Sequence, residues 1–187
     1  DGAWLAAGAE DGGVSIWDID TGVTRQVWSG HESMVRGVSI SSDGKLLASG
    51  AADRTVRIWE VETGKQLHVM RGHTDSVVGV AFGLEGRLLA SASSDSTIRL
   101  WDVSNGAFVR SIYPGMGSVE SVSFSPDGTR LAVGVRRGSI HIFDVASGEL
   151  VMRLAGHDSR IEGLAFGPNG RLLVSGGFDM TVQIGRA

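Results

Sequence analysis

Histidine, serine and aspartate, the residue types of a nucleophilic catalytic triad, recur along this chain at a constant spacing. In each set the serine follows the histidine by 18 residues and the aspartate follows it by 22. The three sets are His31, Ser49 and Asp53; His73, Ser91 and Asp95; and His157, Ser175 and Asp179. An active site needs only one set, so three copies point to a structural role. We therefore expect no catalytic residues and no enzyme activity.

Tryptophan recurs along the chain with the same period as the three sets. Trp17, Trp59 and Trp101 stand 42 residues apart, and the next two positions hold Phe143 and Gly185. A period of roughly 20–50 residues indicates a solenoid, a propeller or another repeat array. A generic β-sandwich, the alternative all-β fold, requires no identical residues at a fixed period.

Each period reads as four short strands separated by turns. In the period that runs from Met34 to Met70, the strand-like segments are 34–40, 46–49, 55–59 and 65–70. Asp43-Gly44 and Thr63-Gly64 supply turn residues between them. Strands of this length and spacing are typical of an all-β repeat, and glycine interrupts every stretch that could form a sustained helix.

Gly72-His73, Ser91, Asp95 and Trp101-Asp102 together resemble a WD-repeat (WD40) β-propeller blade, and the resemblance covers essentially the whole chain. It implies an all-β propeller of four-stranded antiparallel blades. It also implies a structural tetrad in which the indole donates to serine, serine meets histidine and histidine donates to aspartate. The tetrad residues it identifies are His31, Ser49, Asp53 and Trp59; His73, Ser91, Asp95 and Trp101; and His157, Ser175 and Asp179.

One repeat has lost all four tetrad residues together. Gly115, Val133, Arg137 and Phe143 stand where histidine, serine, aspartate and tryptophan would be. Removing one partner leaves a buried polar group unsatisfied at a cost of ~1–3 kcal/mol, whereas replacing all partners can be nearly neutral. Wholesale loss is what a structural network predicts, and we expect packing of Phe143 and Val133 to hold this blade together.

The ends of the chain fall inside repeats. Asp1-Gly2 matches Asp43-Gly44, so the first blade should lack its innermost strand, and 184–187 should leave the last blade without its outermost strand. We expect about four and a half blades of a ring that the resemblance implies has about seven. The remaining blades would come from the same chain or from another copy. The expected repeat units are 1–29, 30–71, 72–113, 114–155 and 156–187.

The resemblance also places a binding surface where the histidine loops and aspartate turns emerge. Three arginines there could pair with carboxylate or phosphate groups, and two apolar side chains could anchor a partner. The candidate partner-binding residues are Met34, Arg36, Glu120, Arg136, Arg160, Glu162 and Phe178. The alternative is an ordinary solvated loop surface.

Composition and charge further limit the classes of partner that the chain could bind. The net charge of -4 argues against nucleic acid, and no apolar segment approaches the ~20 residues of a membrane span. The chain has no cysteine and no signal segment, which favours the cytoplasm. Histidines on separate blades could not share a metal ion, so we expect no metal and no cofactor.

Three functions remain open. The first is a non-catalytic scaffold that binds a peptide or a folded protein on the face of the histidine loops. The second is a sensor or regulatory domain of a larger multidomain NTPase, kinase or protease. The third is a small-ligand or enzymatic propeller that uses the central channel, which the small apolar residues expected there disfavour.

Overall fold

The computed structural model describes residues 4–113, 115 and 117–186. Its strands form five antiparallel sheets. Three sheets have four strands each: β4 (Val35–Ile40), β5 (Leu46–Ala51), β6 (Val56–Glu60) and β7 (Gln66–Met70); β8 (Val77–Gly83), β9 (Leu88–Ser93), β10 (Ile98–Asp102) and β11 (Phe108–Ile112); β12 (Val119–Phe124), β13 (Arg130–Val135), β14 (Ser139–Asp144) and β15 (Leu150–Ala155).

The two end sheets have three strands each. The first contains β1 (Trp4–Gly8), β2 (Val14–Asp18) and β3 (Thr24–Trp28), and the last contains β16 (Ile161–Phe166), β17 (Leu172–Gly177) and β18 (Val182–Arg186). A short 3-10 turn, η1 (Leu84–Gly86), joins β8 to β9. No helix in the described part of the chain is long and apolar enough to cross a bilayer.

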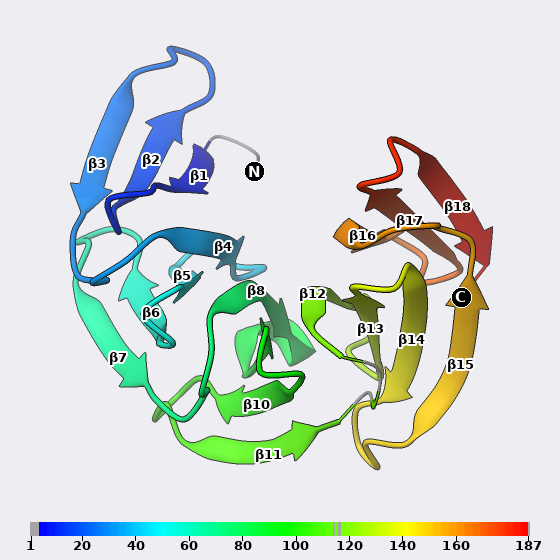
Figure 1. Cartoon of the computed structure of the whole chain (residues 1–187). Helices are drawn as coiled ribbons and strands as arrows, with labels where there is room; N and C mark the ends of the chain where they lie inside the picture. The colour runs from blue at the N-terminus through cyan, green and yellow to red at the C-terminus, as the bar shows by residue number, and fades with distance from the viewer. Residues whose placement is uncertain (1–3, 114, 116, 187) are drawn as a thin grey trace.

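The sheets stand around a common centre like the blades of a propeller (Figure 1). Strands β4, β8, β12 and β16 line the inside of the arc, while β7, β11 and β15 lie on its outside. The arc does not close between the first sheet and the last. By repeat position, the first sheet lacks an inner strand and the last lacks an outer one. The predicted all-β, incomplete propeller is confirmed.

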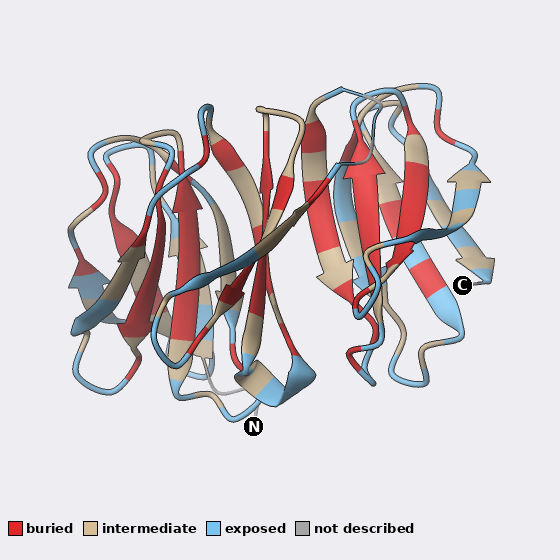
Figure 2. Cartoon of the chain, turned by 90° about the horizontal axis from the view of Figure 1, so that it is seen from below, coloured by how far each residue is buried: buried red, intermediate tan, exposed pale blue. Residues whose placement is uncertain are grey.

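The core lies between neighbouring sheets, because each blade buries one face against the next. A leucine at the same place in the second strand of each blade illustrates this. Leu47 and Leu89 are 0% exposed, whereas Leu5 of the first sheet, which has no preceding sheet to cover it, is 57% exposed. Figure 2 shows buried residues running along the strands and exposed ones gathered at the loops.

The inner strands approach each other closely because glycine lies between them. A Cβ atom added at Gly37 of β4 would lie 2.9 Å from the Cα atom of Gly79 in β8. The next inner strand, β12, carries Ser121 at this repeat position, and its hydroxyl donates to the Ile161 carbonyl of β16. Small side chains therefore set the radius of the arc.

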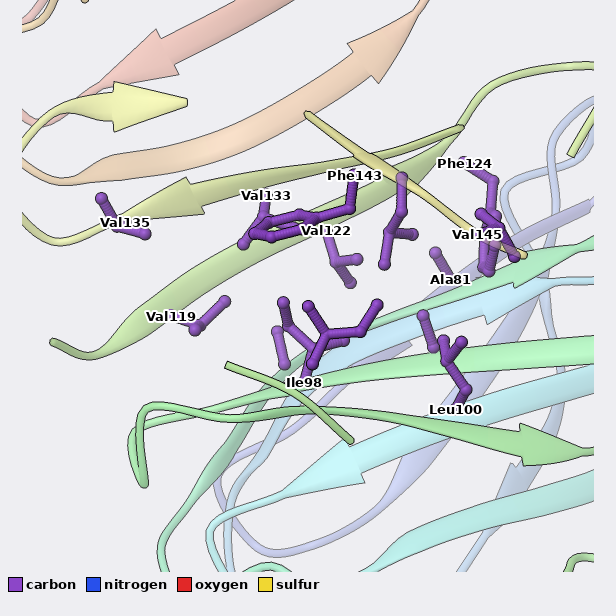
Figure 3. Packing of buried hydrophobic residues seen from close by; sticks show 14 residues of the cluster. Ala81, Ile98, Leu100, Val119, Val122, Phe124, Val133, Val135, Phe143 and Val145 are labelled. Carbon is purple, nitrogen blue, oxygen red and sulfur yellow. The ribbon is translucent and has the colours of Figure 1, made fainter. Parts of the chain in front are cut away.

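The blade without a tetrad is held by apolar packing, as its sequence predicts. Val133 and Phe143 are buried in one cluster with Val122, Phe124 and Leu131. Figure 3 shows this cluster between two sheets. The apolar side chains make a polar network unnecessary there.

We expect Gly37→Ala to lower the free energy of unfolding by ~1–3 kcal/mol, because overpacking forces neighbouring backbone apart. Gly163 is the matched control, since it has the same repeat position in β16 and a Cβ atom there would meet nothing within 4 Å. Gly163→Ala should change stability by no more than ~0.5 kcal/mol. Chemical denaturation measures both, and equal losses would contradict this packing of the inner strands.

Candidate functional site

Two kinds of loop meet at one end of every complete blade. In a four-stranded antiparallel sheet, the loop before the first strand and the turn between the second and third strands lie at the same end. The first carries the histidine of each set and the second carries the aspartate. We call this surface the His–Asp face.

In the second sheet the four predicted tetrad residues form one chain of hydrogen bonds. Trp59 Nε1 donates to Ser49 Oγ at 2.8 Å, and Ser49 Oγ lies 2.7 Å from His31 Nε2. His31 Nδ1 lies 2.9 Å from Asp53 Oδ2. Because indole N–H can only donate and carboxylate can only accept, the serine hydroxyl donates to Nε2 and the neutral imidazole donates from Nδ1.

The third sheet repeats this arrangement. Trp101 Nε1 donates to Ser91 Oγ at 2.8 Å, and Ser91 Oγ lies 2.8 Å from His73 Nε2. His73 Nδ1 lies 2.8 Å from Asp95 Oδ2. Ser49 and Ser91 are both 0% exposed, so neither hydroxyl can reach a substrate.

A threonine that sequence reasoning missed completes each network. Thr55 donates to Asp53 Oδ1 through its hydroxyl at 2.7 Å and through its backbone N–H at 2.9 Å. Thr97 makes the same two bonds to Asp95. The signal was present in the sequence, because Thr55, Thr97 and Thr181 stand 42 and 84 residues apart.

Hydrogen bonding controls the charge of the network. Burial alone would raise the pKa of Asp53, but bonds from Thr55, the Glu32 backbone N–H and His31 outweigh it and lower that pKa to about 2. Burial lowers the pKa of His31 and of His73, against the opposing effect of their aspartates. The network therefore holds a charged aspartate and a neutral histidine near neutral pH.

The fourth sheet has a buried histidine instead of a tetrad. His141 of β14 is 0% exposed, and its Nε2 atom lies 3.3 Å from Ser139 Oγ. Its Nδ1 atom has no hydrogen-bond partner among the described residues, and burial lowers the pKa of the His141 side chain. Sequence reasoning missed its burial because residues at this repeat position elsewhere include the arginines Arg57 and Arg99.

The fifth sheet keeps three of the four tetrad members. His157 Nε2 lies 2.8 Å from Ser175 Oγ, and His157 Nδ1 lies 2.9 Å from Asp179 Oδ2. Gly185 occupies the position of the indole. Ser175 thus has one hydrogen-bond partner in this set, where its counterparts have two.

The candidate partner-binding residues form separate groups on the His–Asp face. A backbone hydrogen bond from Phe178 N to Arg160 O, 2.9 Å, brings these two together on the fifth blade. Met34 and Arg36 lie on the second blade, while Glu120 and Arg136 lie on the fourth. No hydrogen bond or ion pair joins one group to another among the described residues.

Exposure differs within these groups. The residues that are exposed are Arg36, Arg136, Glu162 and Phe178, and those that are partly buried are Met34, Glu120 and Arg160. On the fifth blade the Arg160 guanidinium lies over the Phe178 ring, 4.3 Å from its centroid, and also pairs with Glu162. Together with Met180 these residues line a hollow of about 520 Å³.

Met180 also lines this hollow, and its side chain is 97% exposed. Met180 was not among the candidate partner-binding residues predicted from the sequence. It follows Asp179 in a left-handed conformation, with φ of 63°. Gly12 and Gly138 fill the same repeat position in other blades, which is the residue type this conformation favours. The Met180 side chain therefore lies on the surface of the turn and takes no part in the core.

A family model described as IFT122 first beta-propeller matches residues 1–184. No protein of curated function matches the chain.

We expect Ser91→Ala to lower the free energy of unfolding by ~1–3 kcal/mol, because it leaves the Trp101 N–H and His73 Nε2 without their partner. Thr74→Ala, at an exposed position of the same blade where no hydrogen bond of the hydroxyl is found among the described residues, serves as the control and should change stability by no more than ~0.5 kcal/mol. Urea denaturation measures both. Equal stability of Ser91→Ala and the unaltered protein would show that the network contributes nothing.

We also expect stability to fall as the pH drops below about 6.5, the ordinary pKa of histidine. His31, His73 and His141 have lower pKa values in the folded protein than this, so the unfolded chain binds protons first and is favoured. The unfolding free energy, measured by urea denaturation between pH 7.5 and 5, should decrease. His73→Gln should make that decrease shallower; a stability that rises toward pH 5 would contradict the assignment.

Proposed function

The chain belongs to the IFT122 first beta-propeller family, and we propose that it is a non-catalytic scaffold for protein–protein interaction. The fold alone does not decide this, since propellers host many functions. The buried hydroxyls of Ser49 and Ser91 support it, because residues of triad type are engaged within the protein interior. The proposal assigns catalysis to none of the three His–Ser–Asp sets.

We place the binding surface on the His–Asp face. The observation that carries this choice is the pair of exposed apolar side chains beside a stacked arginine: Phe178 is 62% exposed and Met180 is 97% exposed. Aromatic residues, methionine and arginine are enriched at protein interfaces relative to the rest of the protein surface.

The expected partner is a peptide or folded protein that offers both acidic and apolar side chains. Arg36 and Arg136 are exposed and belong to none of the ion pairs formed between described residues. A guanidinium binds a carboxylate through two parallel hydrogen bonds. Phe178 and Met180 would receive the apolar part of the partner, while Met34, Glu120 and Glu162 set its orientation.

Further blades would cover the two faces at the ends of the arc. Val182 is 73% exposed and Ile184 is 69% exposed, although Ile98 and Leu100, at the same repeat positions, are 0% and 1% exposed. We propose that blades from the same chain or from another copy pack there. The same exposure fits equally the second candidate function, a sensor or regulatory domain of a larger multidomain NTPase, kinase or protease. For either function we propose the cytoplasm, because the chain has no cysteine.

We expect the combined substitution of Arg36, Arg136 and Arg160 by alanine to weaken partner binding at least about tenfold. The partner would be captured with the unaltered protein, purified and titrated against each variant by calorimetry. Phe178→Ala should cause a loss of similar size. Both variants must retain the thermal stability of the unaltered protein.

Arg87→Ala is the matched control, because this arginine is exposed at the opposite end of the blades, next to the turn between β8 and β9. It should leave the affinity unchanged. Unchanged affinity in the triple variant, or equal loss in Arg87→Ala, would overturn the proposed surface. An upstream nucleotide-binding loop in the complete reading frame would favour the sensor function over an independent scaffold.

A further inference from the structure

A cavity of about 240 Å³ lies between the fourth and fifth sheets. Its apolar wall comes from Ile140 and Leu154 of the fourth sheet and Leu173 of the fifth. Ser175 and His157 line another part of it. A Cβ atom added at Gly185, which also lines the cavity, would meet nothing within 4 Å.

In the second sheet, a tryptophan side chain occupies the repeat position that Gly185 has in the fifth. Trp59 stands there, three periods before Gly185, and is buried with residues of the first and second sheets. Its neighbours match the cavity wall position by position: Val14 matches Ile140, Trp28 matches Leu154 and Leu47 matches Leu173, each 126 residues later. The cavity therefore has the surroundings of an indole ring without the ring.

The polar end of the cavity has the matching chemistry. In the second and third sheets, an indole N–H donates to the serine that also contacts the histidine, at 2.8 Å in both. Ser175 occupies this place, is 3% exposed and contacts His157 Nε2 at 2.8 Å. A hydroxyl has one donor and two acceptor positions. Since its proton is directed to His157, Ser175 retains the capacity to accept a ring N–H.

We propose that this cavity binds an indole ring. The ring N–H donates to Ser175 Oγ, and the ring packs among Ile140, Leu154 and Leu173. The volume is sufficient, because an apolar cavity of ~150 Å³ already holds benzene. The indole comes either from a free heterocycle or from the tryptophan side chain of a polypeptide that inserts beside Gly185.

Calorimetry and thermal unfolding of the full chain with indole test the proposal. Indole should bind and raise the melting temperature, because a ligand that binds only the folded state stabilises it. 1-Methylindole, which has no N–H, should bind about fivefold more weakly. N-Acetyltryptophanamide separates the two sources: tighter binding than indole points to an inserted side chain, and weaker binding points to a free heterocycle.

Two variants locate the site. Gly185→Trp should fill the cavity, raise the melting temperature and abolish indole binding. Ser175→Ala should bind indole and 1-methylindole equally, which keeps the test valid if Gly185→Trp does not fold. Absence of indole binding to the unaltered protein, which a cavity occupied by water alone would give, overturns the proposal. Undiminished binding to folded Gly185→Trp overturns it as well.

Discussion

The burial of one blade's face against the next is the constraint on which the rest of this structure depends. A single sheet here has too little apolar surface to fold alone, so every repeat must place the same side chains against its neighbour. Leu47, Leu89 and Leu131 are each 0% exposed for this reason. The hydrogen-bond chains then join the histidine loop to the aspartate turn, which fixes the His–Asp face above the packed sheets.

Polar networks and apolar packing are interchangeable solutions to this constraint, provided that each is complete. Trp59 and Trp101 are buried with their N–H groups satisfied, whereas the fourth blade packs Phe143 against Val133 and has no indole to satisfy. The fifth blade is intermediate, because it keeps the serine and the histidine but has Gly185. A cavity with a polar end follows directly from that mixture.

The repeat period could be read from the sequence. It predicts the strands, the open arc and the residues of the polar networks, because each of these features depends on residues one period apart. What the sequence could not supply depends on contacts between different repeats or on backbone conformation. His141 shares its repeat position with Arg57 and Arg99, residue types that predict an exposed position, although Arg57 is itself only 7% exposed in the structure. The cavity beside Gly185 likewise requires two sheets in place. The left-handed conformation of Met180, by contrast, could have been inferred from Gly12 and Gly138 at the same repeat position. The repeat boundaries and the partner-binding residues remain predictions.

The most direct test of the structural role of the networks is hydrogen exchange at the tryptophan indoles, followed by NMR. Trp59 and Trp101 donate to buried serines, whereas Trp17 of the first sheet has Ala7 where the serine would stand. The indole protons of Trp59 and Trp101 should exchange only through unfolding of the blade, much more slowly than that of Trp17. Exchange of all three at the rate of an exposed indole would contradict the account.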